Sequence, residues 1–262
     1  MLIAILNQST VVKDADAATM TGAIASQILS DVAPIWERAP ATVTFYADPT
    51  KVPAEAHVIA IVDTIQDQPT GVQGFHAMNQ AGQTWGLVAA QPELANSAQV
   101  LTGDWSVSST LSHEVLEMFI DPDCNLWATD GNGTAYSVEV CDPVEAPTYP
   151  VNGVSVANFV TPSWFDPLAP VGTHQFDKLG LLTAPFTVLP TSSAAGCGYM
   201  TYGPGQQQPP GQLQAAGQQQ APGQLQQQQW GKGYPAWRQT MKSGPWSRNT
   251  QRVQQVQALW HP

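Results

Sequence analysis

The spacing of apolar residues divides the first 120 positions into helices and strands. Two segments repeat apolar side chains at helical spacing. One spans 14–36, with Asp14 in its first turn and Pro34 near its end, and the other spans 106–120. Short apolar runs predict β-strands at 2–6, 43–46, 57–63 and 85–89. This order of elements predicts an α+β fold.

After residue 120 the pattern becomes irregular, with many proline, glycine and aromatic residues. Short alternating or β-branched stretches predict further strands at 136–140, 154–160 and 186–189. We therefore expect one folded domain over 1–200, whose second half consists largely of loops.

The chain changes character again after residue 202. Segments 205–216 and 217–228 are a tandem repeat of 12 residues, rich in glutamine, proline and glycine. Such a composition buries too little apolar surface to offset the entropy lost on ordering. We expect 203–229 to be a linker within a disordered or extended Gln/Pro/Gly-rich C-terminal arm.

The terminal segment, 230–262, combines tryptophan with arginine and lysine and contains no acidic residue. Aromatic and arginine side chains are enriched at protein interfaces. We expect this segment to bind other copies of the chain or other proteins of an assembly. The residues expected to make these contacts are Trp230, Trp237, Arg238, Trp246, Arg248 and Arg252.

Charge separates the chain into an acidic body and a basic arm. All 20 acidic residues lie between Asp14 and Asp177, and only three basic residues occur before residue 178, whereas 178–262 carry six basic residues and no acid. Binding to phosphates requires clustered lysine and arginine, so nucleic acid is not expected to bind the body. The basic arm keeps nucleic acid open as a partner.

Targeting signals and membrane spans are not expected. The opening apolar run ends at Asn7 without a basic segment before it, which predicts a strand rather than a signal peptide. No apolar run approaches the roughly 20 residues of a membrane span. The three cysteines are too few for a disulfide framework. Cytoplasm, or a particle assembled there, is the expected location.

The helix predicted at 106–120 carries the most informative chemistry. Its apolar side chains fall on one arc, and His113 and Glu117 lie roughly 40° apart on the other side, one turn from each other. A histidine and a carboxylate in this relation can hold a divalent metal ion, while Glu114 can reach a water molecule on it. The arc predicted to face the core contains Val107, Leu111, Val115, Met118 and Phe119.

A metal site of this kind requires a third ligand from another segment. In the strand predicted at 136–140, Glu139 is the first candidate, and Asp142 is an alternative ligand or a hydrogen-bond partner of His113. Zinc is the expected ion, with manganese or calcium as alternatives because carboxylates make the site harder.

Other candidate groups receive structural interpretations. Cys124 and Cys141 are expected to be small buried thiols. Residues 121–125 resemble the start of a calcium loop but lack its glycine, which favours a simple turn. His57, in a strand, and His76, in a predicted turn, show no ligand spacing and are expected to be structural.

Through His113-Glu114-x-x-Glu117 the chain resembles the zincin metallopeptidases. It looks more closely like a family of uncharacterised zincin-like proteins from bacteria and phages. The resemblance covers about residues 1–200 and implies a zincin-like mixed sheet with an active-site helix beneath its edge strand. The motifs that carry it lie at 5–12, 112–118, 121–122, 139–142, 158–165, 177 and 185–186.

Two functions follow as hypotheses. The first is a zinc-dependent hydrolase, a peptidase acting on a peptide or protein, with His113, Glu117 and Glu139 holding the metal and Glu114 as general base. Tyr136, Tyr149 or His174 are candidates for stabilising the oxyanion. The alternative is a catalytically inactive zincin-fold protein of a phage particle, a capsid or virion component that uses its arm for assembly contacts.

Overall fold

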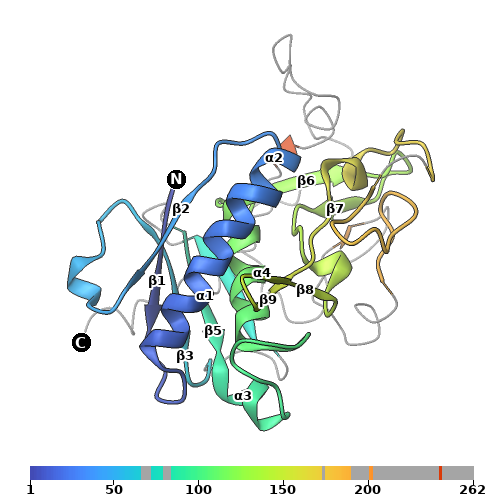
Figure 1. The fold of residues 1–262 in the computed structure, drawn as a ribbon. Coiled ribbons are helices and arrows are strands. Elements are labelled where there is room, and N and C mark those ends of the chain that lie inside the picture. Colours follow the sequence, from blue (N-terminus) through green and yellow to red (C-terminus); the bar gives the residue numbers. More distant parts are fainter. Residues whose placement is uncertain (66–71, 79–83, 173–174, 190–200, 203–241, 244–262) are drawn as a thin grey trace.

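The structure, a computed structural model, describes residues 1–65, 72–78, 84–172, 175–189, 201–202 and 242–243. Its centre is a mixed five-stranded sheet with the strand order β2-β1-β3-β5-β4 (Figure 1). Four strands are parallel, and β4 runs antiparallel to β5 at one edge. The strands are β1 (Leu2–Asn7), β2 (Thr42–Tyr46), β3 (His57–Val62), β4 (Gly74–Met78) and β5 (Thr84–Ala89).

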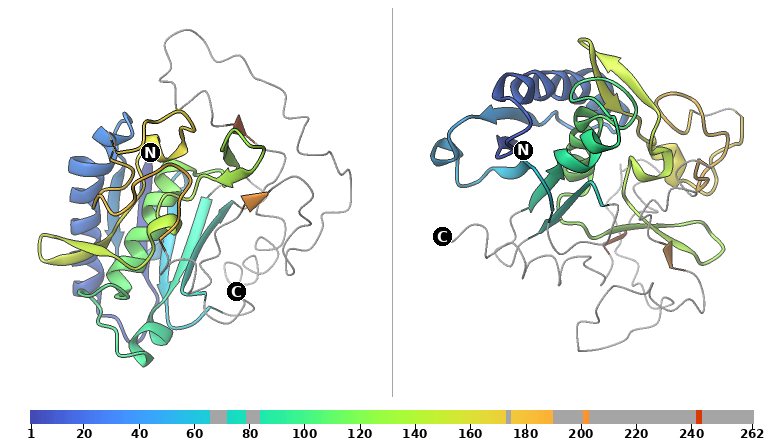
Figure 2. Two further views of the ribbon diagram at one scale, coloured as in Figure 1. Left: turned by 90° about the vertical axis from the view of Figure 1, so that its right-hand side faces the viewer. Right: turned by 90° about the horizontal axis from the view of Figure 1, so that it is seen from below.

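Two long helices cover one face of this sheet. Helix α1 (Asp14–Gln27) packs against β1 and β2, while α4 (Val107–Ile120) packs against β4 and β5 and touches α1. Figure 2 shows both helices on the same side of the strands. The short helix α3 (Ala90–Ala95) follows β5 directly and leads toward α4.

Short strands and turns complete the second half of the described chain. Strands β6 (Leu126–Thr129) and β7 (Ala135–Ser137) form a hairpin, which β10 (Thr201–Tyr202) and β11 (Lys242–Ser243) extend. A second hairpin packs its β9 strand against α4 and α1. This second hairpin consists of β8 (Thr148–Val151) and β9 (Val154–Ala157), and the same half contains the 3₁₀ turns Asp142–Val144 and Pro162–Phe165. One further 3₁₀ turn, Pro49–Lys51, follows β2.

The main core lies between the helices, the sheet and the loops of the second half. Trp36 and Trp164 are among its largest fully buried side chains, and Trp164 stacks edge-on against Phe165 with 4.7 Å between ring centroids. Edge-to-face pairs of this kind add to the stabilisation from buried apolar area. A smaller cluster occupies the opposite face of the sheet, where Phe75 packs edge-on against Trp85.

Most of the predicted elements of the first half are confirmed, including the helix at 107–120 and the four parallel strands. The helix predicted over 14–36 is present without a gap, but it is not α-helical throughout. After α1 comes a π-helical turn, Ile28–Val32, and then the short α2 (Ala33–Ile35). Pro34 lacks the N–H that an α-helical ladder needs, and it lies two residues after the end of this turn. The α+β class and the mixed sheet are therefore correct.

Three sequence predictions need correction. The segment around His76 was expected to be a turn, but it is the edge strand β4, whose five residues are too short to show alternation. The strand predicted at 136–140 ends at Ser137, and residues 186–189 do not form a strand. In both of the latter cases backbone groups bond outside a ladder, as when Leu189 N–H donates to the Pro143 carbonyl.

Among the described residues, none of the helices has the length and apolar character that crossing a bilayer requires. The arm, 203–262, lies outside the described residues except for Lys242–Ser243, which pairs antiparallel with β6.

The pH dependence of stability offers a test of the packing between α3 and α4. Burial raises the pKa of Glu93 from 4.5 to about 8, although an interaction with Thr110 opposes this shift. The folded state therefore binds a proton more tightly than the unfolded state, and the resulting stability is present below pH 4.5 and lost as the pH rises through about 8.

We expect Glu93→Gln to remove this loss, because the amide cannot ionise. Its free energy of unfolding should match that of the wild type near pH 4.5 and exceed it increasingly up to pH 8, by at most about 1.4 kcal/mol per pH unit. Urea denaturation at several pH values measures the difference, with the exposed Glu55→Gln as control. A difference that does not change with pH would contradict the prediction.

Candidate metal centre

Helix α4 is buried nearly all round, although it carries acidic residues. Ser106 begins it by accepting a hydrogen bond from the Ser109 N–H through its side-chain oxygen. All five side chains of the predicted apolar arc are buried. Glu114 and Glu117 on the other side are only 5% and 3% exposed, so they do not form the solvated polar face of an ordinary amphipathic helix.

A first group of metal-ligating side chains surrounds His113. Its Nε2 lies 3.3 Å from Glu117 Oε1, one helical turn later, and 3.1 Å from Asp142 Oδ1. One ligand atom from each of these three residues lies within 4.8 Å of the other two. The side chains of His113 and Asp142 are 15% and 17% exposed, so this group is open to solvent on one side.

A second group meets the first at Glu117. His76, on the edge strand β4, places Nδ1 3.9 Å from Glu117 Oε2 and 3.5 Å from Glu114 Oε2. Glu139 joins His76 and Glu117, with the ligand atoms of the three within 4.8 Å of one another. All three residues of this second group are buried.

Local backbone geometry brings these segments together. The Cys141 N–H donates to Glu117 Oε1 over 3.2 Å, which fixes the segment that carries Glu139 and Asp142 against α4. Gly74 lets β4 approach the helix closely, because a Cβ there would lie 2.7 Å from Glu114 Oε1 and 2.9 Å from its Cγ.

A buried hydrogen-bond network holds the middle of α4 in place. Ser112, directly before His113, donates to Gln27 Oε1 over 2.7 Å and accepts from the Ala157 N–H over 3.0 Å. Gln27 in turn donates to the Ala157 carbonyl. One hydroxyl thus ties α4 to α1 and to β9.

The carboxylates and histidines shift one another's proton affinities. Burial lowers the pKa of His113, but Glu117 and Asp142 outweigh it and raise the pKa well above the usual value. Burial likewise opposes protonation of His76, yet Cys124, Glu114 and Glu117 raise its pKa to about 10. Burial and the charge of Glu117 raise the pKa of Asp142 to about 7. The centre therefore favours added positive charge.

The structure brings together all the residues predicted as metal ligands, in two groups. Asp142, the alternative third ligand, lies beside His113, whereas the first candidate, Glu139, lies on the far side of Glu117 with His76. Sequence reasoning missed His76, which was expected to be structural. No spacing rule links it to the helix, since it arrives on an edge strand through tertiary packing.

The structural interpretations of several other residues agree with the structure. Cys124 and Cys141 are buried free thiols. Residues 121–125 form a turn in which the Asp121 carboxylate accepts from the Asn125 and Leu126 N–H groups. By contrast, Tyr149 was a candidate for stabilising the oxyanion, and its hydroxyl donates to Asp31 in the π-helical turn that follows α1.

Two sets of predicted residues lie outside the described part of the chain. One is His174, a candidate oxyanion donor. The other is the interface set Trp230, Trp237, Arg238, Trp246, Arg248 and Arg252.

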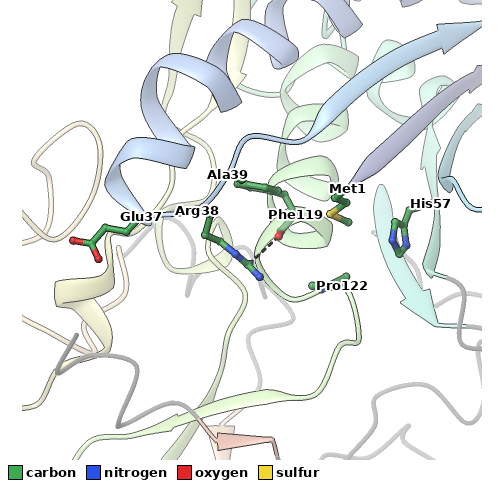
Figure 3. Close-up of a pocket in the computed structure, with 7 residues that line it drawn as sticks. All are labelled: Met1, Glu37, Arg38, Ala39, His57, Phe119 and Pro122. Atoms are coloured by element: carbon green, nitrogen blue, oxygen red, sulfur yellow. Dashed lines mark hydrogen bonds between the residues drawn. The ribbon is translucent and has the colours of Figure 1, made fainter. Parts of the chain in front are cut away.

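A pocket of about 480 Å³ lies at the C-terminal end of α4 and does not include the metal-ligating groups. Figure 3 shows Arg38 reaching across it toward the end of the helix. Its Nη1 donates to the carbonyls of Phe119 and Ile120. The helix dipole is negative at this end, so a cation is favourable here. His57 borders this pocket and belongs to neither of the two metal-ligating groups. These contacts indicate a role for Arg38 in ending the helix.

No family model, curated protein or solved structure matches the chain. Its function must therefore be inferred from the chemistry of the site.

Ser112→Ala tests the network that positions His113. The substitution leaves the Gln27 carbonyl oxygen and the Ala157 N–H without their hydroxyl partner in a buried region, which should lower the free energy of unfolding by about 1–3 kcal/mol. Urea denaturation measures this loss. Thr19→Ala is a matched control, because its exposed hydroxyl bonds only within its own helix and its removal should change stability by less than about 0.5 kcal/mol. Equal effects of the two substitutions would argue against the network.

Proposed function

We propose that this chain is a divalent-metal-dependent hydrolase that cleaves peptide bonds. The observation that carries the proposal is that Asp142, from the turn after β7, meets His113 and Glu117 of α4, the helix that also carries Glu114. Nitrogen and carboxylate ligands of this kind are found in catalytic zinc sites that use three protein ligands. The partial exposure of His113 and Asp142 leaves a side from which a substrate can approach.

The donor set fits such an ion. One imidazole and two carboxylates suit zinc and also manganese. The buried carboxylates need positive counter-charge. In the described residues they form ion pairs with His76 and His113. These histidines must be neutral to act as ligands, so a bound cation would then supply the counter-charge. A bound divalent ion at this place would polarise a carbonyl group and lower the pKa of water.

Glu114 is the residue proposed as general base. It directly follows His113 on α4, and its Oε2 lies 3.5 Å from His76 Nδ1. A carboxylate in this position accepts a proton from the attacking water and delivers it to the departing amine. The close approach of β4 leaves no room for a side chain at position 74 beside Glu114, because a Cβ there would lie 2.7 Å from Glu114 Oε1.

The arrangement of α4 and β4 supports a zincin-like interpretation of this site. The resemblance carried by His113-Glu114-x-x-Glu117 implies an active-site helix beneath the edge strand of a sheet. Here α4 packs against β4, the antiparallel strand at the edge. The distances favour Asp142 over Glu139 as the third ligand of the ion held by His113.

Glu114→Gln separates catalysis from metal binding. The amide keeps the size of the side chain but cannot accept the proton, so the rate of casein cleavage should fall by about 10²–10⁴-fold while bound zinc stays unchanged. Cleavage is followed by release of labelled peptides, and zinc by elemental analysis. Glu55→Gln, on the exposed surface, should retain full activity. Cleavage that survives Glu114→Gln or complete removal of metal would contradict the proposal.

A further inference from the structure

We infer that the centre binds two divalent ions, with Glu117 as the ligand common to both. The inference deepens the proposed function and rests on it for its catalytic meaning, although the binding itself can be measured separately. It assigns His113 and Asp142 to one ion and His76 and Glu139 to the other.

The two oxygens of Glu117 face different histidines. Oε1 lies 3.3 Å from His113 Nε2, whereas Oε2 lies 3.9 Å from His76 Nδ1. The hydrogen bond from the Cys141 N–H to Oε1 holds the carboxylate in this orientation. A carboxylate that offers one oxygen to each side is suited to bridging two ions, which lie about 3.5–4 Å apart in two-metal hydrolytic sites.

Each side has its own nitrogen donor and its own second carboxylate. On the open side these are His113 and Asp142, and on the buried side they are His76 and Glu139. A single ion on the open side leaves His76 and Glu139 without a catalytic or binding role, although β4, which carries His76, approaches α4 closely at Gly74. Each side thus offers one imidazole and one carboxylate in addition to Glu117, so the two sides can hold ions with similar ligands.

Formal charge favours the same conclusion. Four carboxylates gather here: Glu114, Glu117 and Glu139 are buried, and Asp142 is mostly so. When the two histidines are neutral, as ligands must be, one divalent ion leaves a charge of about −2 and two ions leave about zero. Uncompensated buried charge is strongly unfavourable, so the second ion stabilises the occupied centre.

Metal content of the full-length protein tests the inference. The chain is stripped with a chelator, loaded with Zn²⁺, freed of excess ion by gel filtration and analysed for zinc per chain. We expect about two ions for the wild type and about one for each of His76→Ala and His113→Ala. The matched control is His57→Ala, which replaces a histidine of strand β3, in the same sheet but outside both groups, and should retain two.

Loading with Mn²⁺ gives a second readout that does not depend on activity. Two bridged manganese ions should show a spin-coupled electron paramagnetic resonance spectrum in the wild type, and the signal of a single ion in His76→Ala and His113→Ala. Circular dichroism establishes that each variant is folded. If His76→Ala does not fold, His76→Gln replaces it, and the wild-type stoichiometry and coupling still decide the matter.

The outcomes separate this inference from the proposed function. A wild type that binds at most one ion per chain and shows no coupling overturns the two-ion centre, even if cleavage depends on Glu114. Two coupled ions without any peptide cleavage support the two-ion centre and contradict the peptidase. Loss of both ions in His57→Ala would show that the count reflects general folding, and it would also overturn the assignment.

Discussion

The interaction on which this structure depends is the contact between buried carboxylates and histidines around α4. A helix packed on nearly all sides can bury glutamate only if compensating groups lie beside it. His113 from the helix itself and His76 from β4 supply these groups. This electrostatic requirement therefore links the positions of three segments: the edge strand β4, the segment after β7 and the helix α4.

Contacts with the surrounding fold fix the position of α4 and of the turn that follows it. Ser112 anchors the helix to α1 and β9, while Arg38 binds the carbonyls at its C-terminal end. The Asp121 carboxylate closes the turn that follows the helix and so directs the chain into β6. Because these contacts do not involve the histidines and carboxylates of the candidate centre, the scaffold can hold those side chains near one another by itself.

The same centre unites features that look unrelated along the chain. Gly74 is needed because the backbone of β4 approaches Glu114, and the strand carries His76 two residues later. Glu139 and Asp142 lie just beyond β7, where the chain leaves the strand ladder and turns beneath α4. Because β7 ends at Ser137, Glu139 and Asp142 are not confined to the face of a strand. They can therefore approach the helix from different sides.

The sequence alone determined the elements whose patterns are local. Helical spacing identified α4 and placed His113 and Glu117 on one side of it, and apolar runs identified the parallel strands. The tertiary structure alone decided that this side is buried and that His76 belongs to the centre. It also decided that Asp142 faces His113 while Glu139 faces His76. These relations come from packing between segments distant in the chain, and such contacts leave no periodic signal in the residues that make them.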